Sequence, residues 1–426
     1  MVRGKSGGQL IQRVSLGQRV YSFKYNSRME ASVAKIESMN SRERLLAAIE
    51  HRDVDHVPCS FMLYKSLLTQ SHGYSEFIQR QIAMGLDAFV QLPPRAPVVK
   101  SDSYNLHGLP VSFHKEVTTR EWKETISGEK WPILIKAYDT PAGKLTTEVF
   151  QDPEWPYDEH VPFLDDHLES RAHKYLITTI EELGALRYLL VPPNEKEITN
   201  FKEESRPLQE FAAREGLLVA GGWGVGADML AWLYGLEHMM FAVYDRPDLL
   251  DELLDIVYLW NQNRMQVVLD AGIDLYIKRA WYENCDFWTP DSWRRYIYPM
   301  LKGDVDLAHD MGAKFGYLIT ANCMPLLEDI YRAGVDVIIG VDPAKWDLVK
   351  AQEILGGKVC LWGGVNGHLA VEQGSEDQVR QQVCEALDIF KQGRGFILSP
   401  VDNIRENTAL TNHNVEALID EWQKTN

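Results

Sequence analysis

The sequence predicts an α/β protein, a (β/α)8 TIM barrel with an antiparallel β insertion. Between Gly312 and Ile404 the chain repeats a short apolar run, a polar tip and a helical stretch. Apolar strands that alternate with helices are typical of a parallel sheet covered on both faces. Counting from Val57 gives eight such strands, the number that closes a barrel. An open doubly wound sheet is the alternative, but no strand is followed by a dinucleotide-binding fingerprint.

The elements of this barrel follow from apolar periodicity and from turn residues. We expect the ordered chain to open near Ser41, which can cap a helix whose apolar face carries Leu45 and Ile49. The expected parallel strands are 57–61, 88–92, 217–220, 275–278, 314–319, 336–340, 359–362 and 395–398. The clearest expected helices are 77–84, 207–214, 229–243, 247–271 and 290–301, the last continuing to 311.

Residues 100–160 depart from this rhythm. Strand-like segments alternate with hairpin signals at Ser127-Gly128 and Thr140-Pro141-Ala142-Gly143. The expected strands of this insertion are 111–116, 121–125, 133–138 and 145–149. We therefore expect one domain, 39–426, that carries a β-rich cap at 100–160 beside the mouth of the barrel. Residues 1–38 are basic and aperiodic, which favours a disordered extension or a start codon placed too far upstream over a transit peptide.

Composition excludes several classes of partner. Acidic residues (61) outnumber basic residues (44), and the formal net charge is −17. Such a surface repels nucleic acid and anionic membranes, so we expect neither as a partner. No apolar run is long enough to cross a bilayer. The five cysteines lack disulfide-framework spacing, which favours a reducing, cytoplasmic compartment.

Carboxylates follow three of the expected strands. Glu283, Asp342 and Asp402 lie at strand ends, where barrels place their active sites. Converging carboxylates serve as general acids, as metal ligands or in structural networks. We expect Glu283 and Asp402 to be catalytic, with helix capping as the alternative. Asp342 is a candidate for substrate binding, although Asp342-Pro343 can simply begin a turn.

Aromatic and amide side chains crowd the same strand ends. The aromatic residues suggest a flat or methyl-bearing organic ligand, with core packing as the alternative. The amides are candidate hydrogen-bond donors to that ligand, with local turn bonding as the alternative. The candidate substrate-binding residues, besides Asp342, are Tyr64, Trp223, Trp281, Asn322, Trp362, Asn366 and Asn403. The glycines of 221–226 form no phosphate cradle, because no Lys-Ser/Thr pair follows them. They either let the backbone approach a substrate or simply form a turn.

Several motifs together resemble a known family. They include Thr289-Pro290, His309-Asp310-Met311-Gly312-Ala313, the tip Leu361-Trp362-Gly363-Gly364-Val365-Asn366 and Gly395-Phe396-Ile397-Leu398-Ser399-Pro400. In this order they resemble the uroporphyrinogen decarboxylase superfamily, which also contains corrinoid- and cofactor-linked methyltransferases. With its weaker middle part, the resemblance covers residues 40–426. It implies an enzyme and leaves the reaction open.

Two departures from the family pattern narrow the reaction. The segment Phe61-Met62-Leu63-Tyr64-Lys65 lacks the arginine pair that would hold porphyrinogen carboxylates, which speaks against uroporphyrinogen as the substrate. The family's thiol-activating methyltransferases bind zinc through a His-x-Cys after the fifth strand and a Cys after the eighth. This chain has Leu318 and Thr320 at the first pair, and Val401-Asp402 at the eighth tip.

The resemblance therefore implies a methyltransferase that does not activate a thiol. We expect it to move a methyl group from a small methylated compound, such as a methoxyaromatic, to a corrinoid carried by a separate protein. Any metal, with zinc as the candidate, is expected to be held by Glu283 and Asp402, with Cys285 and Cys323 as softer additions. The alternatives are a decarboxylase that acts on a small acid or a porphyrinogen, and a barrel that only binds a ligand or a partner.

Overall fold

The computed structural model describes residues 39–94, 102, 109–390 and 394–425. The predicted extension 1–38 lies outside the described residues, as does part of the predicted insertion. None of the helices in the described ranges has the length and apolar character needed to cross a membrane.

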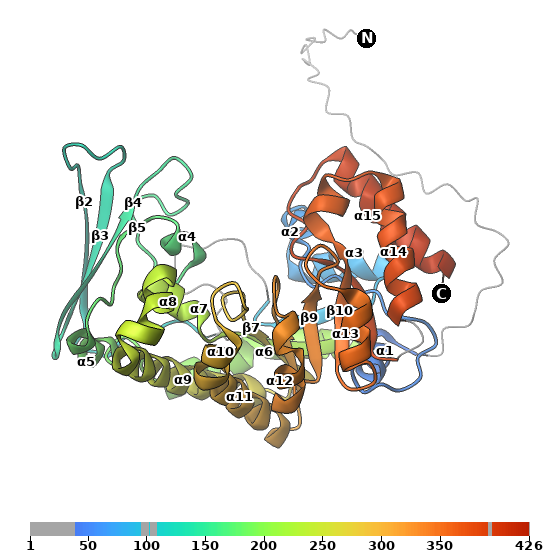
Figure 1. Ribbon diagram of the computed structural model, residues 1–426, viewed down its shortest axis with the longest axis horizontal. Coiled ribbons are helices and arrows are strands. Elements are labelled where there is room, and N and C mark those ends of the chain that lie inside the picture. The colour runs from blue at the N-terminus through green and yellow to red at the C-terminus, as the bar shows by residue number, and fades with distance from the viewer. Residues whose placement is uncertain (1–38, 95–101, 103–108, 391–393, 426) are drawn as a thin grey trace, which may run out of the picture. The chain divides into compact units, whose positions relative to one another are not determined.

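The larger sheet has seven parallel strands (Figure 1). In spatial order they are β1 (Phe89–Leu92), β6 (Leu218–Val225), β7 (Leu275–Arg279), β8 (Lys314–Leu318), β9 (Val337–Val341), β10 (Cys360–Asn366) and β11 (Phe396–Val401). Every pair is parallel, as in Leu275 opposite Lys314 and Trp362 opposite Ile397. Each strand is buried along nearly its whole length, which is expected for a parallel sheet packed on both faces.

The expected strand 57–61 takes a different form. It is represented by two isolated parallel bridges, Cys59 with Leu398 and Leu63 with Asn403. The Ser60 N–H donates to the Leu398 carbonyl at 2.9 Å, so the segment runs beside β11. On its other side, the Asp87 N–H donates to the Cys59 carbonyl at 2.8 Å, just before β1 begins. The segment lies where the sequence predicted a strand, but it forms isolated bridges and not an eighth regular strand.

Helices cover the outer face of the parallel sheet (Figure 1). Helix α1 (Ser41–Ile49) begins with a capping box in which Asn40, rather than the predicted Ser41, is the N-cap. Its Leu45 and Ile49 belong to the same buried cluster as Phe89 and Leu218 of the inner strand face. The helices that follow in the chain are α2 (Lys65–Thr69), α3 (Tyr74–Ala83), α4 (Asp166–Glu169), α5 (Leu183–Leu186), α6 (Glu195–Glu215), α7 (Asp228–Leu233), α8 (Leu236–Asp245), α9 (Pro247–Leu269), α10 (Pro290–Tyr296), α11 (Tyr298–Asp310), α12 (Leu327–Ala333), α13 (Leu348–Leu355), α14 (Glu376–Phe390) and α15 (Ala409–Thr425).

Three helix predictions need correction. The helix expected at 290–301 ends at Tyr296 as α10, and α11 begins at Tyr298. The helix expected at 207–214 is α6, which begins after the capping residue Asn194 and contains Pro207 in its interior. The capping box with Glu197 starts the helix there, and the proline was mistaken for a first-turn residue. The helix expected at 229–243 is divided into α7 and α8 by Gly235, whose φ of 93° is left-handed.

The insertion forms a four-stranded antiparallel sheet in the order β2-β3-β4-β5. Its strands are β2 (Thr118–Glu124), β3 (Ile133–Thr140), β4 (Gly143–Phe150) and β5 (Ala172–Lys174). The expected strand 111–116, which lies within the described residues, is absent from this sheet. Its Phe113 packs edge-on against Tyr138 and Phe163, and the His114 N–H donates to the Tyr188 carbonyl outside the sheet. The strand-like pattern of this segment thus reflects loop packing rather than strand pairing.

Candidate functional site

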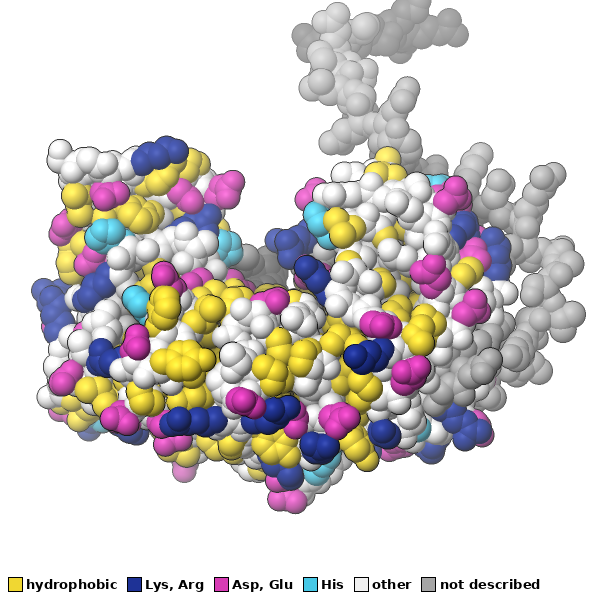
Figure 2. Space-filling view, viewed as in Figure 1, with side chains coloured by type: hydrophobic (Ala, Val, Ile, Leu, Met, Phe, Trp, Pro, Cys, Tyr) yellow, Lys and Arg dark blue, Asp and Glu magenta, His cyan; other side chains and the backbone are white. Residues whose placement is uncertain are grey.

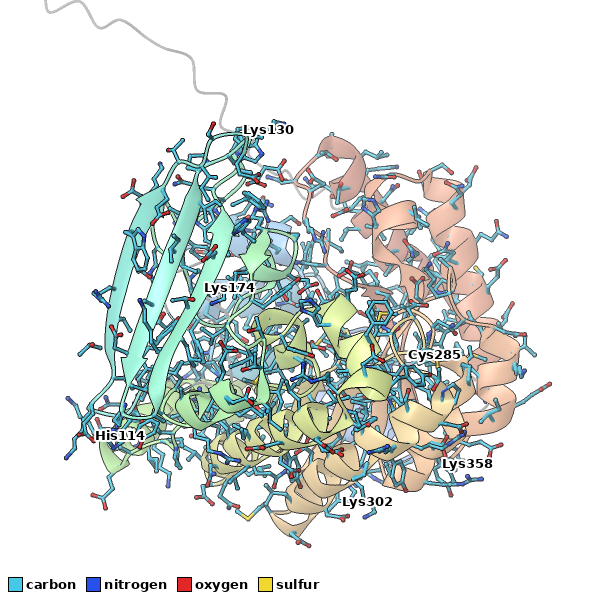
Figure 3. The ribbon with its side chains drawn as sticks, turned by 60° about the vertical axis from the view of Figure 1, so that its left-hand side comes forward. His114, Lys130, Lys174, Cys285, Lys302 and Lys358 are labelled. Carbon is cyan, nitrogen blue, oxygen red and sulfur yellow. The ribbon has the colours of Figure 1, made fainter. Side chains whose placement is uncertain are left out.

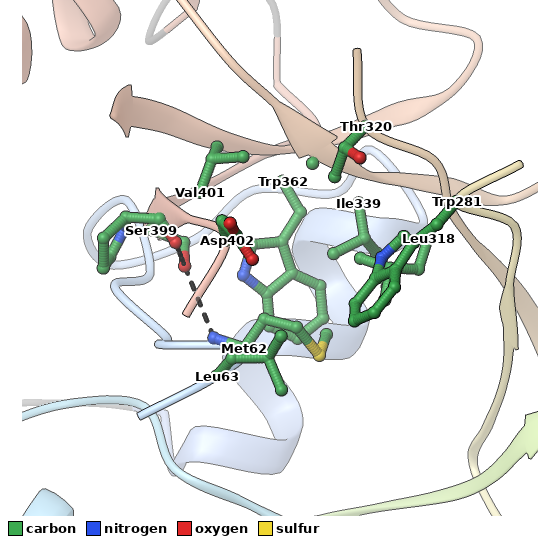
Figure 4. Close-up of a pocket in the computed structure, with 12 residues that line it drawn as sticks. Met62, Leu63, Trp281, Leu318, Thr320, Ile339, Trp362, Ser399, Val401 and Asp402 are labelled. Atoms are coloured by element: carbon green, nitrogen blue, oxygen red, sulfur yellow. Dashed lines mark hydrogen bonds between the residues drawn. The ribbon is translucent and has the colours of Figure 1, made fainter. Parts of the chain in front are cut away.

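A pocket opens at the C-terminal ends of the last strands of the parallel sheet (Figure 4). We call it the strand-end pocket. Strands β8 to β11, the loop after β7 and the 62–63 segment each contribute to it. Its lining residues are Met62, Leu63, Trp281, Leu318, Thr320, Ile339, Gly340, Trp362, Ser399, Pro400, Val401 and Asp402. The lining is mostly apolar and carries two indole rings, two hydroxyls and one carboxylate.

The two indoles are held by different means. Trp362 is buried, and its Nε1 donates to the Ser60 carbonyl at 2.8 Å, which fixes the ring in place. Trp281 is half-buried, and the Arg279 guanidinium carbon lies 3.9 Å from its ring centroid. A further indole, Trp223, meets Trp281 edge-on at 6.4 Å between ring centroids. Aromatic surface that is fixed before binding suits a flat organic ligand.

Glycines allow the strands below the pocket to approach closely. Gly340 has a φ of 109°, and a Cβ there would lie 2.6 Å from the Ile319 carbonyl oxygen. Gly363 has a φ of 155°, and a Cβ there would lie 2.5 Å from the Val341 oxygen. The register between β9 and β10 shifts at Trp362 and Gly363. This bulge carries β10 onward to Asn366, past the tip that the sequence suggested.

Among the described residues, Asp402 is the one carboxylate that lines the pocket. It directly follows β11 and has a φ of 67°, a left-handed conformation that Asp tolerates better than most residues. Its side chain is 47% exposed, and Arg405 Nη2 lies 3.4 Å from Oδ2. The Asp402 carboxylate is therefore open to solvent while it borders the pocket.

Glu283 lies in different surroundings, where its side chain is fully buried. Its Oε1 accepts from the Ala227 N–H at 2.9 Å, and its Oε2 accepts from the Tyr317 hydroxyl at 2.5 Å. Lys278 Nζ lies 3.6 Å from Glu283 and 2.9 Å from Asp304 of α11. We call Lys278, Glu283, Asp304 and Tyr317 the buried ion cluster. None of the four lines the strand-end pocket.

Electrostatics within the buried ion cluster keep Lys278 charged. Burial lowers the pKa of Lys278, but the carboxylates of Asp304 and Glu283 outweigh it and raise that pKa above its ordinary value. Burial and the Glu283 charge also raise the pKa of the Tyr317 hydroxyl, which remains a donor. The cluster thus joins β7 and β8 to α11 through paired charges and hydrogen bonds.

Gly226 makes room for this cluster. A Cβ at that position would lie 2.3 Å from Glu283 Oε1 and 2.9 Å from Lys278 Nζ. The two sequence readings of the glycine-rich tip were approach to a substrate and turn formation. At Gly226 the close neighbours are instead charged side chains of the protein itself.

Beside the cluster, Arg279 ends β7 and stacks on Trp281 of the pocket. Its Nε lies 2.9 Å from Asp228, and it also pairs with Asp166 of α4. Asp228 accepts from the backbone N–H groups of Trp281 and Tyr282 at 3.2 and 2.8 Å. This arrangement fixes the loop that carries Trp281 into the pocket.

The other predicted substrate-binding residues form hydrogen bonds with groups of the protein and do not line the strand-end pocket. The Asp342 carboxylate accepts from the Ala344 N–H and from the Asn366 side chain, each at 2.9 Å. Asn366 caps the next turn by accepting from the Leu369 N–H. Asn403 accepts from the Lys65 N–H at 3.0 Å at the start of α2. The Asp342–Ala344 and Asn366–Leu369 bonds match the turn and capping alternatives stated for the sequence. The Asn366–Asp342 and Asn403–Lys65 bonds instead join segments that are distant in the sequence.

Tyr64 and Asn322 also lie apart from the pocket lining. Tyr64 is buried against Phe61, with ring centroids 5.4 Å apart, and burial raises the pKa of its hydroxyl to about 12. The Asn322 side chain is exposed, and the Asn322 backbone carbonyl accepts from the Cys285 N–H at 2.8 Å. Of the predicted site residues, Trp281, Trp362 and Asp402 come together around the pocket, with Trp223 beside Trp281.

The predicted metal donors do not form one centre. Within the described residues, no group of three His, Cys, Asp or Glu side chains is placed to hold a metal ion. Burial raises the pKa of Cys323 well above its usual value, and burial also raises that of Cys285 (labelled in Figure 3). Both Glu283 oxygens already accept hydrogen bonds from Ala227 and Tyr317. Glu283, Cys285, Cys323 and Asp402 therefore do not fit a shared metal site.

Sequence reasoning did not select the buried partners Lys278, Asp304 and Tyr317. Lys278-Arg279 at the end of a continuous apolar strand was the available signal, since buried cations require carboxylate partners. It also did not select Met62 and Ile339 of the pocket. Those apolar side chains carry no sequence signal that separates a ligand-facing position from a core position.

Comparisons with known proteins fit this geometry. Residues 177–424 match the family described as uroporphyrinogen decarboxylase (URO-D). No curated protein sequence matches the chain. Among solved structures, a methyltransferase from Methanosarcina mazei is similar at 17% identity and a TM-score of 0.55, over 91% of this chain and 99% of that one. A B12-independent methionine synthase from Shewanella sp. W3-18-1 aligns at 9% identity and a TM-score of 0.43, over 87% of this chain and 97% of that one.

Proposed function

Because the chain belongs to the uroporphyrinogen decarboxylase family, we propose that it is a methyltransferase whose reactive site is the strand-end pocket. The proposed substrate is a small methoxyaromatic compound. The proposed methyl acceptor is the corrinoid of a separate protein. Parallel-sheet enzymes of this kind place their ligands beyond the C-terminal ends of the strands, where this pocket lies.

One observation carries the proposal. Leu318, Thr320, Val401 and Asp402 stand at the positions where the resemblance places the metal ligands of thiol-activating relatives. All four line the same pocket, although they come from strands that are far apart in the sequence. This convergence supports the alignment and favours the pocket as the site. At the same time, the described side chains of its lining provide no thiolate or imidazole for zinc.

The lining chemistry favours an aromatic methyl ether over a thiol or a polyanion. Trp281 offers ring surface, and the buried Trp362, Met62, Leu318 and Ile339 form the apolar wall beside it. Neither Arg nor Lys is among the described residues that line the pocket. A porphyrinogen, with its several carboxylates, would require such cations at close range. The decarboxylase alternative therefore gains no support from the described lining.

In the proposed reaction, the bond between the methyl carbon and the aryl oxygen breaks as the corrinoid of the partner accepts the methyl group. The leaving aryl oxygen then gains a proton. Asp402 borders the pocket and is half-exposed, so we assign it to pass that proton from solvent to the oxygen. Trp281 and Trp362 hold the ring and exclude water. Arg279 and Asp228 act as positioning residues, because they fix Trp281 and its loop.

We also propose that the parallel sheet closes into the expected eight-stranded barrel. The supporting contacts are those of the 58–63 segment, which bonds Leu398 of β11 on one side and Asp87 ahead of β1 on the other. Such a closure brings Met62 and Leu63 to the pocket opposite Leu318.

The test is direct. The purified protein is incubated with a reduced corrinoid protein and a panel of methoxyaromatics, and methyl–cobalt formation is followed by absorbance. We expect transfer from at least one methoxyaromatic, and none from the matching phenols. A panel that yields no transfer with several corrinoid proteins would contradict the proposed function. Release of carbon dioxide from aromatic acids or porphyrinogens would favour the decarboxylase instead.

A further inference from the structure

Strand β2 is an open edge of the antiparallel sheet (Figure 1). All seven of its residues are exposed, and it pairs only with β3 among the described strands. The hairpin turn at Lys130 marks one end of this edge in Figure 3. An unpaired edge presents N–H and C=O groups that can bond another strand. What β2 can pair with depends on its side chains.

The charges of β2 are ordered symmetrically about Trp122. Arg120 and Glu124 lie two residues to either side of it, and Glu121 and Lys123 lie one residue to either side. Each pair joins opposite signs. The surface as a whole mixes charges of both signs (Figure 2), so alternation alone would mean little. The distinguishing feature is the reversal of sign across a single aromatic residue.

This order makes the edge complementary to itself. If two copies of β2 pair antiparallel with Trp122 opposite Trp122, Arg120 faces Glu124 and Glu121 faces Lys123 across the pair. Registers displaced by one residue instead place Arg120 opposite Lys123 or Glu121 opposite Glu124. Displacement by two residues places Glu121 opposite Glu121 or Lys123 opposite Lys123. Like charges directly opposite one another oppose pairing, so one register is favoured over its neighbours.

The charged side chains of β2 have partners within the chain, including Glu124, which accepts from Trp122 Nε1 at 2.7 Å, but among the described strands its outer backbone edge is unpaired. Arg120 bonds Asp139 at 2.8 Å while its side chain remains 64% exposed, and Trp122 is 38% exposed. Glu121 turns inward to Lys136 and His160, at 3.1 and 3.0 Å. Arg120 with Glu124 is therefore the outward pair that decides between partners, and Trp122 supplies apolar area at the centre.

We propose that β2 is a homodimer interface, in which two copies of the chain join edge to edge about a two-fold axis through Trp122. The two four-stranded sheets then become one continuous eight-stranded sheet. Closed two-fold pairing uses the same patch on both subunits and leaves no edge for further growth at this site. This inference rests on β2 and does not depend on the proposed function.

Charge reversal tests the interface with the full-length chain. Sedimentation velocity over a range of concentrations measures the dimer dissociation constant. Arg120→Glu places two acidic side chains opposite each other in the dimer, and Glu124→Arg places two basic side chains opposite each other. We expect either change to raise the dissociation constant by about tenfold or more. The double variant Arg120→Glu/Glu124→Arg restores opposite charges and should return to within about threefold of the parent.

Mixing the two single variants gives the sharper result. The Arg120→Glu chain is acidic at both positions 120 and 124, and the Glu124→Arg chain is basic at both. The two chains therefore face each other with opposite charges, and the mixture should form heterodimers although each variant alone stays monomeric. Circular dichroism confirms that the variants fold.

Two outcomes would overturn the proposal. The first is a parent chain that is monomeric up to about 100 μM, and the second is a dimer that neither single variant weakens. A monomeric parent whose single variants lose turnover with the corrinoid protein would assign the edge to that partner instead.

Cross-linking checks the register. Trp122→Cys should form a disulfide-linked dimer under mild oxidation, because the two residues face each other at the axis. The parent and Lys130→Cys, at the hairpin turn, are the matched controls and should remain unlinked. Equal linkage at positions 122 and 130 would contradict the proposed register.

Discussion

The strand-end pocket and the buried ion cluster begin at neighbouring residues and have opposite surroundings. Leu318 lines the pocket, whereas Tyr317, the residue before it, bonds Glu283 behind the sheet. Likewise, Ile277 belongs to the buried apolar cluster that contains Phe89 and Leu218, while Lys278, the next residue, pairs with Asp304 of α11. The alternation of side chains along a strand decides which of the two each residue joins. A carboxylate near a strand end is therefore a site candidate only when its side of the strand is known.

This comparison predicts its largest effect at Lys278. Lys278→Met leaves the carboxylates of Glu283 and Asp304 buried without their cation, and we expect a loss of about 3–5 kcal/mol in the free energy of unfolding. Urea denaturation measures it. The exposed Lys350→Met is the control, with an expected change within about 0.5 kcal/mol. Equal effects of the two changes would mean that the cluster is not a structural unit.

At Asp402 we expect a substitution to lower the activity and to leave the stability nearly unchanged. Asp402→Asn keeps the shape and suits the left-handed backbone, so stability should stay within about 0.5 kcal/mol of the parent. Methyl transfer should fall by about 100-fold or more, because the leaving oxygen loses its proton relay. Glu283→Gln should instead cost about 1–3 kcal/mol of stability. If kcat/KM falls for Glu283→Gln at unchanged stability, while Asp402→Asn is active, the two assignments are reversed.

Packing behind the sheet gives a smaller effect. Gly226→Ala places a methyl group against Glu283 and Lys278, and we expect a loss of about 1–3 kcal/mol. Gly184→Ala is the matched control, since a Cβ there meets only Ala142 Cβ, at 4.0 Å. Thermal unfolding of both variants separates local crowding from the general effect of removing a glycine. If Gly226→Ala leaves the stability unchanged, the side chains of Glu283 and Lys278 can move aside at little cost.

The insertion contains a second ion cluster, formed by Glu121, Lys136 and His160, which is more exposed than the buried ion cluster. We expect this second cluster to make only a small contribution to the pH dependence of stability. Burial raises the pKa of Glu121, but the His160 hydrogen bond and Lys136 outweigh it and hold that pKa at about 2. A lowered folded-state pKa stabilises the protein above the unfolded pKa of about 4.3, and this contribution is lost as pH falls toward 2. Solvent screening limits the effect to about 1 kcal/mol. Glu121→Gln should flatten the stability profile between these pH values, and an unchanged slope would contradict it.

The sequence was sufficient to locate the seven strands of the parallel sheet, since their apolar runs stand out whichever face they pack on. The ends of the strands and helices were harder to predict from the sequence. Gly363–Asn366 reads as a loop but continues β10, because its glycines accommodate a bulge that keeps the ladder intact. Pro207 suggested a helix start, although the capping box at Asn194 lies well before it in the chain. Turn and cap residues were visible in the sequence, but the sequence alone did not show which of them the fold uses.

The site was predictable in part for a related reason. Asp402, Trp281 and Trp362 were selected because they lie at strand ends, and the pocket contains them. Glu283 was selected on the same ground, yet its loop folds back so that its carboxylate meets Ala227 and Tyr317. The path of a loop after its strand depends on contacts with other segments, here the room left by Gly226. No local pattern around Glu283 contains that information.

The most direct test of the central claim is to locate the substrate. Crystals soaked with a methoxyaromatic that supports methyl transfer should show its ring between Trp281 and Trp362, with the ether oxygen toward Asp402. Loss of that density in Asp402→Asn crystals is not expected, since the carboxylate acts on the proton and the indoles hold the ring. Density for the substrate beside Glu283, or away from Leu318 and Thr320, would contradict the account.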